Sequence, residues 1–194
     1  SLKGTFGNAV LSNVEELNVS FGSKAQYSES RSDAERFAET FYRINVKKVI
    51  LNCEYEISEA QVLRNTFSGT QLEIIDISNF TQVPVYSWYR TFYYSGNVRE
   101  IIGEIDFTDA TDTTQGFLNL NALEEIRVKK GTLKVSTSFA QSSKLSGASR
   151  QSICDGLADL TGKTAQTIIF HADVKAKLTD EQISQITSKN WTLA

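Results

Sequence analysis

Histidine and cysteine, the side chains most often used for metal and nucleophilic chemistry, are scarce in this chain. His171 is the only histidine, and Cys53 and Cys154 are the only cysteines. No C-x-x-C pair, phosphate-binding glycine loop or G-x-S-x-G turn occurs. A lone histidine without a second ligand is usually structural, so the sequence predicts neither a zinc site nor an enzyme. The cysteines are interpreted as small buried residues or as a long-range disulfide, and their spacing does not decide between the two.

Carboxylates gather between positions 100 and 112. They are Glu100, Glu104, Asp106, Asp109 and Asp112. Several oxygen ligands close together suit Ca²⁺, so a calcium site is one interpretation. The D-x-x-D spacing matches no calcium loop, and a solvated acidic face is the preferred interpretation. We therefore expect no metal and no cofactor.

The stretch from 86 to 94 has the most unusual composition, because aromatic side chains surround Arg90 on both sides. In one interpretation these rings fill a connector between two strands. In the other they form an exposed platform for a glycan or protein, and Arg90 adds a cation–π contact. The first candidate binding surface comprises Tyr86, Trp88, Tyr89, Arg90, Tyr93 and Tyr94.

Composition limits the classes of protein to which the chain can belong. Of its 194 residues 40% are hydrophobic and 22% are charged, and the net charge is −3. This content supports a buried core and argues against disorder, while the acidic balance argues against a nucleic-acid partner. No apolar run is long enough to cross a membrane, so no membrane insertion is expected. The chain begins SLKG and lacks methionine, so it is interpreted as a piece of a longer precursor.

Apolar residues recur along the chain in the pattern apolar-x-x-apolar-x-apolar. Its leading positions Val46, Leu72, Val98 and Leu123 are 26, 26 and 25 residues apart. In the copy that begins at Val98 two extra residues intrude, which predicts a β-bulge at Gly103. A phenylalanine precedes each lead by five or six residues: Phe41, Phe67, Phe92 and Phe117, with Phe139 in the same relation to Leu145.

This pattern predicts a coil of stacked units. The last two apolar residues of each copy are two apart, so both point to one face of a short strand. The phenylalanine comes from the opposite wall of the coil and fills the space between the walls. One unit cannot bury its apolar face alone, but stacked copies share a core and their strands form a parallel sheet.

The outward face of this sheet is the second candidate binding surface. It alternates with the core set and comprises Glu16, Asn18, Lys48, Ile50, Ile74, Asp76, Glu125 and Arg127. Stacked repeats often present such a face to a partner, and Ile50 and Ile74 would form a small apolar patch. The alternative is a plain solvated sheet.

The connectors between strands are predicted to be partly helical. Capping-box sequences at Ser32–Glu35 and Ser58–Gln61 predict helices. The first helix would bury Ala34, Phe37 and Phe41, and the second would bury Ala60, Leu63 and Phe67. The connector from Asn79 to Thr91 holds the only proline, Pro84, and is aromatic; residues 22–31 and 108–116 are polar and predicted as loops.

The pattern changes after Leu145, and residues 145–194 are interpreted as a cap over the open end of the core. A helix from Ser149 to Leu160 is predicted to bury Ile153, Leu157 and Leu160 and to end at Thr161-Gly162. A strand over 165–170 follows. The capping box Thr179–Gln182 then opens a helix with Leu178, Ile183 and Ile186 inward, and the chain closes with a strand over 190–193, with Trp191 as the plug.

Two segments carry a resemblance to a known family. The string SFAQSSKL (138–145) resembles the A-F-x-x-C-x-x-L step of BspA-like leucine-rich repeats, and LEEIRVKKGTLKV (123–135) resembles the strand and return of that unit. The tail 152–194 is similar to the C-terminal segment of such proteins in gut bacteria and their prophages. The chain departs from the pattern at Ser142, where the family has cysteine, and its period of 25 or 26 residues is longer than usual.

The resemblance implies an α/β fold: a right-handed leucine-rich-repeat-like solenoid with a short parallel sheet, an irregular helical or loop convex side and a C-terminal cap. The whole of 1–194 would be one domain, with repeats over 1–144 and the cap over 145–194. The resemblance also implies an extracellular or cell-surface protein whose partners are proteins or glycans of a host or matrix.

Three functions remain open at this point. The preferred one is a non-catalytic binding or adhesion module of a bacterial surface or secreted protein. The second is a structural or assembly component, such as a phage tail-associated protein whose copies pack together. The third is an enzyme whose site the sequence does not reveal. Ligand identity, the binding face and the oligomeric state are not encoded in any motif.

Overall fold

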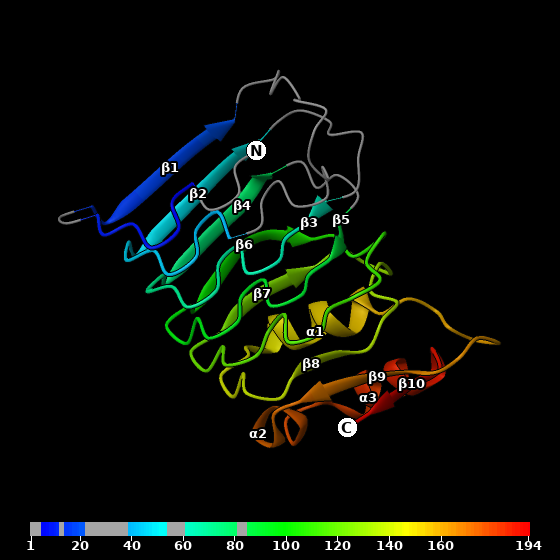
Figure 1. The fold of residues 1–194 in the computed structure, drawn as a ribbon. Helices are drawn as coiled ribbons and strands as arrows, with labels where there is room; N and C mark the ends of the chain where they lie inside the picture. The colour runs from blue at the N-terminus through cyan, green and yellow to red at the C-terminus, as the bar shows by residue number, and fades with distance from the viewer. Residues whose placement is uncertain (1–4, 12–13, 22–38, 54–60, 81–84) are drawn as a thin grey trace.

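The structure, a computed structural model, describes residues 5–11, 14–21, 39–53, 61–80 and 85–194. It is a mixed α/β fold with a five-stranded parallel sheet and few helices (Figure 1). The strands are β1 (Glu16–Phe21), β2 (Lys48–Cys53), β3 (Gln61–Val62), β4 (Ile74–Phe80), β5 (Val85–Ser87), β6 (Glu100–Ile105), β7 (Glu125–Val128), β8 (Thr137–Phe139), β9 (Gln166–Phe170) and β10 (Trp191–Leu193). The helices are α1 (Gly147–Gly156), α2 (Ala172–Lys175) and α3 (Asp180–Ser188).

The large sheet follows the order β1-β2-β4-β6-β7, so its strands succeed one another in chain order. Val49 pairs with Ile75, and Ile75 pairs with Ile101. All three are buried, which places the recurring apolar residues on one face of neighbouring strands. The predicted parallel alignment is confirmed, because a constant step between copies gives a constant register.

β6 contains the bulge predicted at Gly103. Glu100 pairs with Glu125 while Glu104 pairs with Arg127, so β6 has two more residues than β7 over this stretch. Gly103 has φ +100°, and a Cβ there would lie 2.9 Å from the backbone of Ser78 on β4. Only glycine satisfies both the positive φ and the close approach.

The wall opposite the sheet consists of tight turns stacked on one another. The backbone N–H of Phe41 donates to the carbonyl of Thr66 (2.9 Å), and that of Phe67 donates to the carbonyl of Thr91 (2.8 Å). The rings also stack, with centroids 5.4 Å apart for Phe41 and Phe67 and 5.6 Å apart for Phe67 and Phe92. Backbone and side chain therefore repeat together from turn to turn.

The two predicted helices do not form in the described residues. Phe41 and Phe67 lie in turns flanked by left-handed residues, namely Glu39 and Arg43 in one turn and Asn65 and Gly69 in the next. Gln61 belongs to β3, and residues 22–38 and 54–60 lie outside the described residues. In the described residues around Phe41 and Phe67, hydrogen bonds between stacked turns take the place of helical ones. The predicted loop over 108–116 is confirmed apart from an isolated bridge at Asp112.

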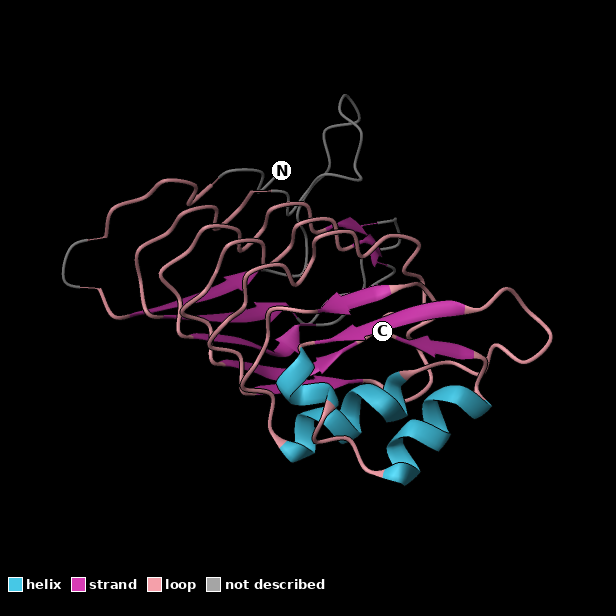
Figure 2. Cartoon of the chain, turned by 90° about the horizontal axis from the view of Figure 1, so that it is seen from below, coloured by secondary structure: helices cyan, strands magenta, loops and turns pink. Residues whose placement is uncertain are grey.

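The C-terminal region forms a separate three-stranded parallel sheet of order β10-β9-β8 with the helices beside it (Figure 2). The predicted strands at β9 and β10 and the capping box at Thr179 are confirmed. The first helix ends earlier than predicted, because Leu157 is extended and its segment bridges to Leu133. Trp191 is buried, as predicted.

Two details of this region differ from the prediction. The side chain of Ile183 points outward on α3 and is 37% exposed, whereas Ile186 faces the core. The short helix α2 was not foreseen, and His171 caps it by accepting a hydrogen bond at Nδ1 from the Asp173 N–H (3.2 Å).

Helix α1 occupies the place where the next strand of the large sheet would stand. The N–H of Ile126 donates to the Ser149 hydroxyl (3.0 Å), and the N–H of Val128 donates to the Ser152 hydroxyl (2.9 Å). Serine side chains thus replace strand partners along β7 and protect an otherwise open edge.

Candidate functional site

The aromatic stretch predicted as a binding platform divides between core and surface. Trp88 is 1% exposed, and its ring centroid lies 5.1 Å from that of Phe107 and 6.4 Å from that of Phe92. The prediction that Trp88 is an exposed binding residue is therefore wrong. Trp88 comes directly after β5, in which Val85 is buried and Tyr86 is exposed; strand alternation would turn position 88 outward, but the chain leaves the strand at Ser87 and the indole packs into the core.

The tyrosines and Arg90 of this stretch remain at the surface. Tyr94 is 58% exposed and Tyr86 is 41% exposed, while Tyr89, Arg90 and Tyr93 are half-buried. Arg90, Tyr93 and Tyr94 line a pocket of about 380 Å³ together with residues from two earlier turns. We call this pocket the tyrosine–arginine slot; its lining is Tyr42, Arg43, Asn65, Ser68, Gly69, Arg90, Tyr93 and Tyr94.

The slot arises from a change of side-chain size between stacked turns. The residue directly after the core phenylalanine is Tyr42 in one turn, Ser68 in the next and Tyr93 in the third. The residue after that is Arg43, then Gly69, then Tyr94. A small pair therefore lies between two large pairs, and the walls on either side enclose the space that it leaves.

Gly69 keeps the floor of the slot low. Its φ is +65°, and a Cβ at this position would lie 3.1 Å from Cγ of Arg43. The neighbouring turns place Arg43 and Tyr94 in the same left-handed conformation, with φ of 54° and 57°. The backbone course is thus common to the three turns, and only the side chain differs.

Both arginines of the slot are held by aromatic rings. The Arg90 guanidinium carbon lies 5.0 Å from the Tyr89 centroid and 4.8 Å from the Tyr93 centroid, and Nε donates to Oε1 of Gln115 (2.6 Å). The Arg43 guanidinium lies 5.0 Å from the Tyr42 centroid. Such cation–π contacts fix the long side chains and leave further N–H donors for a ligand.

Tyr93 and Tyr94 meet edge to face, with centroids 4.4 Å apart. Desolvation, followed by the neighbouring Tyr94, raises the pKa of Tyr93, so its phenol is protonated at neutral pH. The slot consequently offers phenol and guanidinium donors beside ring faces. Tyr86 and Tyr89 do not line it.

The outward sheet face, the second predicted surface, has the expected alternation. Glu16, Lys48, Ile74, Glu100 and Glu125 occupy one row across the sheet. In the next row Asn18 pairs with Ile50, Ile50 with Asp76 and Asp76 with Ile102.

The apolar patch on this face is smaller than predicted. Lys48, Ile50, Ile74 and Asp76 are half-buried rather than exposed, whereas Glu125 and Arg127 are exposed. The patch around Ile50 and Ile74 is therefore partly covered by its polar neighbours.

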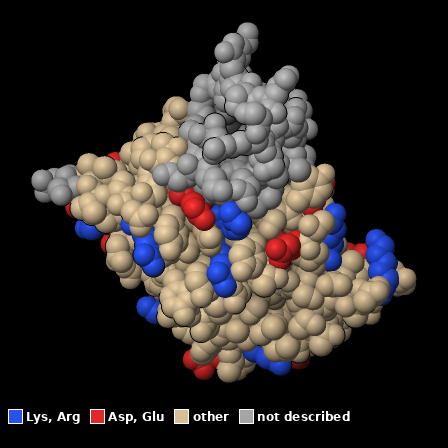
Figure 3. All heavy atoms as spheres, viewed as in Figure 1, with Lys and Arg blue, Asp and Glu red and all other residues tan. Residues whose placement is uncertain are grey.

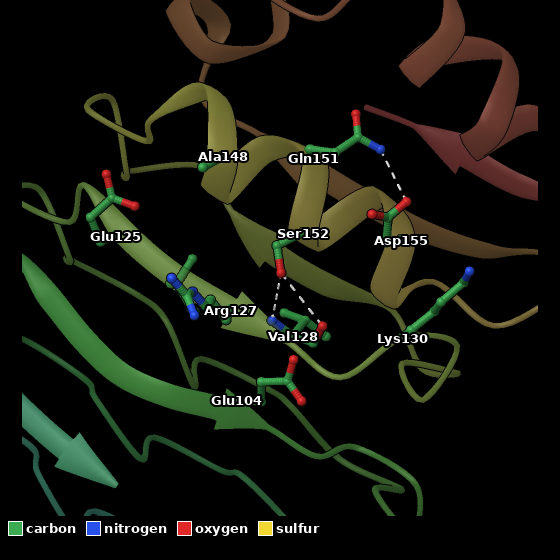
Figure 4. A pocket seen from close by; sticks show the side chains of 10 residues that line it. Glu104, Glu125, Arg127, Val128, Lys130, Ala148, Gln151, Ser152 and Asp155 are labelled. Atoms are coloured by element: carbon green, nitrogen blue, oxygen red, sulfur yellow. Dashed lines mark hydrogen bonds between the residues drawn. The ribbon is translucent and has the colours of Figure 1, made fainter. Parts of the chain in front are cut away.

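A groove of about 420 Å³ lies where this face meets α1 (Figure 4). Glu104, Glu125 and Arg127 line it from the strands, and Gln151 and Asp155 line it from the helix. Gln151 donates to Asp155 (3.0 Å), so part of its polar lining is already paired. Sequence reasoning placed Glu125 and Arg127 correctly on this face but did not foresee the groove, because α1's position depends on the tertiary fold.

Asp106 and Cys154 are two other side chains of types that could take part in chemistry, and both lie among contacts of the fold itself. Asp106 accepts hydrogen bonds from the Lys129 ammonium (2.6 Å) and the Thr108 hydroxyl (2.6 Å). Cys154 is a free, buried thiol, and burial raises its pKa to about 11. Because Cys154 forms no disulfide, the interpretation of a long-range bond to Cys53 is wrong.

Within the described part of the chain, no three acidic, histidine or cysteine side chains gather in a metal-binding arrangement. On the face seen in Figure 3, basic and acidic side chains are scattered among uncharged ones.

Comparison with known proteins does not assign the chain to a family. Among the described residues, no helix has the length and apolar character needed to span a membrane. No protein-family model, no curated protein and no solved structure matches the chain.

Proposed function

We propose that the chain is a BspA-like leucine-rich-repeat solenoid, right-handed, with a loop-rich convex side over 1–144 and a cap over 145–194. Support comes from the chain-order parallel sheet, the stacked phenylalanines and α1 covering β7. In such an arrangement each turn contacts only its neighbours, which leaves long outer surfaces free for recognition.

We further propose that this solenoid is a non-catalytic recognition or adhesion module of a bacterial surface or secreted protein, acting outside the cell. Its ligand is a glycan or protein of a host or matrix. The observation that carries this proposal is the tyrosine–arginine slot, because it gathers partly exposed rings and oriented donors around a hollow. Aromatic and arginine side chains contribute most to binding energy at recognition surfaces.

Filling the slot tests this proposal. Ser68→Tyr puts a third tyrosine between Tyr42 and Tyr93, where both neighbouring turns already accommodate one. Ser68 is 3% exposed, so enlarging it should cost about 1 to 3 kcal/mol of stability. We expect a variant that still folds by circular dichroism but no longer binds the ligands found for the wild type on glycan and matrix-protein arrays. Ser68→Ala, which leaves the slot open, and Tyr86→Ser, which removes an exposed ring outside it, should both bind normally. Binding that survives Ser68→Tyr would remove the slot from the function.

A second candidate function, assembly with sister copies, has one specific observation in its favour. In the described part of the chain β1 has a strand partner on one side only, whereas the edge of β7 is covered by α1. An unpaired edge is a template for another strand. Light scattering across a concentration series tests this candidate: growth of the mass with concentration supports assembly, and a constant monomer mass excludes it.

A further inference from the structure

We propose that the tyrosine–arginine slot takes the ring of a carboxylated sugar, such as a uronic or sialic acid residue of an acidic glycan. This inference rests on the proposed function and specifies its ligand. The carboxylate would meet the guanidinium groups of Arg43 and Arg90 at the slot, and the sugar ring would lie between the walls formed by Tyr42 and Tyr93.

The charge of the slot selects an anion. Arg43 and Arg90 are the charged side chains among its lining residues, and no carboxylate is present in that lining. Neither guanidinium forms an ion pair with a carboxylate of the described residues. Glu39 lies in the same turn as Arg43 but does not line the slot, and it stands two turns from Arg90 in the same column, with Asn65 between them. The planar fork of arginine is suited to a carboxylate, which it binds through two N–H donors.

The guanidinium groups are prepared for such a ligand. Arg90 is held by Tyr89, Tyr93 and Gln115, and Arg43 by Tyr42. A side chain that is already ordered loses less conformational entropy on binding than a free one. Two positive groups are thus kept in fixed positions although no carboxylate of the described residues pairs with them.

The width of the slot favours a saturated ring. Phe41 and Phe92 precede the two walls and lie on either side of Phe67, with steps of 5.4 and 5.6 Å between centroids, so the two turns that carry the walls are about 11 Å apart in the core. A flat ring between two walls requires roughly 7 to 8 Å, since optimal carbon contacts are about 3.5 to 4.0 Å on each side. The larger separation suits a puckered pyranose with hydroxyl groups on both faces. The phenol of Tyr93 and the amide of Asn65 lie in the lining and offer hydrogen-bond partners to those hydroxyls.

An acidic peptide is the competing ligand, because its carboxylates would also meet the two arginines. A peptide backbone needs paired N–H and C=O partners, as an exposed strand edge provides. The backbone N–H groups of Asn65 and Gly69 in the slot already donate to the carbonyls of Tyr89 and Tyr93. The slot is therefore better suited to side-chain contacts with a sugar than to backbone pairing with a peptide.

A matched pair of ligands tests the inference directly. The probes are a galacturonic acid tetrasaccharide and its fully methyl-esterified form, in which each carboxylate becomes an uncharged methyl ester; sialyllactose and its methyl ester form a second pair. We expect the wild-type chain to bind at least one acid at least tenfold more tightly than its uncharged partner in calorimetry. Arg43→Gln and Arg90→Gln should each weaken that binding about tenfold, because each removes a charge-assisted contact. Arg99→Gln, the same change at an exposed arginine beside Glu73, should leave it within twofold.

The possible outcomes separate the inference from the function on which it rests. Equal binding of acid and uncharged partner, or binding of neither acid, overturns the carboxylated-sugar inference. If an array ligand such as an acidic peptide then binds and is lost in Ser68→Tyr, the proposed function stands without this inference. If acid binding persists in Ser68→Tyr, both the slot and the inference fail. Preference for sialyllactose over the tetrasaccharide, or the reverse, identifies the sugar within the proposed class.

Discussion

At the scale of single residues, the buried serines facing the phenylalanine stack differ in their hydrogen bonding. Ser95 and Ser142 each come three residues after a core phenylalanine, and both are 0% exposed. The Ser95 hydroxyl donates to the carbonyl of Phe67 (2.5 Å) and lies 3.2 Å from the Thr70 hydroxyl. The Ser142 hydroxyl has no hydrogen-bond partner among the described residues. An unsatisfied buried hydroxyl costs about 1 to 3 kcal/mol, so Ser142 is a weak point of the core.

We predict that Ser142→Cys raises the free energy of unfolding by about 1 to 2 kcal/mol, because a thiol of similar shape loses little when it has no partner. Ser95→Cys should lower it by about 1 to 2 kcal/mol, since it breaks an existing network. Urea denaturation under reducing conditions measures both. A stabilised Ser95→Cys, or a destabilised Ser142→Cys, would contradict this account of the core.

Protonation of Asp106 should make the free energy of unfolding depend on pH. Partial burial raises its pKa, but hydrogen bonds from Lys129 and Thr108 outweigh this effect, and the net pKa is lowered. A carboxyl whose pKa is lower in the folded state adds stability above its unfolded pKa, and that stability is lost as the pH falls through the folded pKa. We predict that Asp106→Asn lowers the free energy of unfolding by about 1 kcal/mol at pH 7. Below about pH 4, near the ordinary pKa of Asp, the difference from the wild type should shrink. Denaturation curves at pH 7, 5 and 3 measure it; a difference that grows toward pH 3 would refute the proposed ion pair.

At the scale of elements, α1 acts as the final partner of the large sheet. Ser149→Ala and Ser152→Ala would leave the N–H groups of Ile126 and Val128 without their acceptors. We predict a loss of about 1 to 2 kcal/mol for each variant and faster hydrogen exchange at those two amides. Ser184→Ala on the exposed face of α3 is the control, because it makes the same change in a helix without touching a strand. Unchanged exchange at Ile126 and Val128 would mean that α1 does not protect the edge.

The strands were predicted correctly from the sequence, whereas other features of the fold were not. The step of 25 or 26 residues predicted the strands and their register, because hydrophobic periodicity reflects the shared core directly. The helices expected around Phe41 and Phe67 do not extend into the described residues, where left-handed turns bond to the next turn; their capping boxes lie almost wholly outside the described part of the chain. Trp88 was misplaced, since an aromatic run does not show which of its rings the coil turns inward.

The spacing that produces the slot is visible in the sequence, but it could not be recognised without knowing how the turns align in the stack. Tyr42, Ser68 and Tyr93 are separated by the same steps as the core phenylalanines that precede them. Once the turns are stacked, this spacing places a serine between two tyrosines. Arg90 and the tyrosines 93 and 94 were candidates from the start, whereas Tyr42 and Arg43 lie 50 residues away in the chain and were missed.

At the scale of the whole molecule, one column of phenylalanines connects the N-terminal turns to the C-terminal sheet. Ring contacts run from Phe6 through Phe41, Phe67, Phe92, Phe117 and Phe139 to Phe170. Every ring from Phe41 to Phe170 is buried, while Phe6 is half-buried. If stability is a sum over neighbouring turns, a defect in the middle of the column should cost more than one at its start.

We therefore predict that Phe67→Ala lowers the free energy of unfolding by about 3 to 5 kcal/mol, since it removes a buried ring that stacks on both sides and leaves a cavity. Phe6→Ala should cost less than half as much, because within the described residues this ring stacks on Phe41 alone and is partly solvated. Denaturant melts give the two values, and hydrogen exchange locates the loss. In Phe67→Ala, protection should fall in β2, β4 and the turns on either side, while β8, β9 and β10 retain theirs. Uniform loss of protection from β1 to β10 would instead mean that the molecule unfolds as one cooperative unit, and the description of it as a stack of turns with nearest-neighbour contacts would fail.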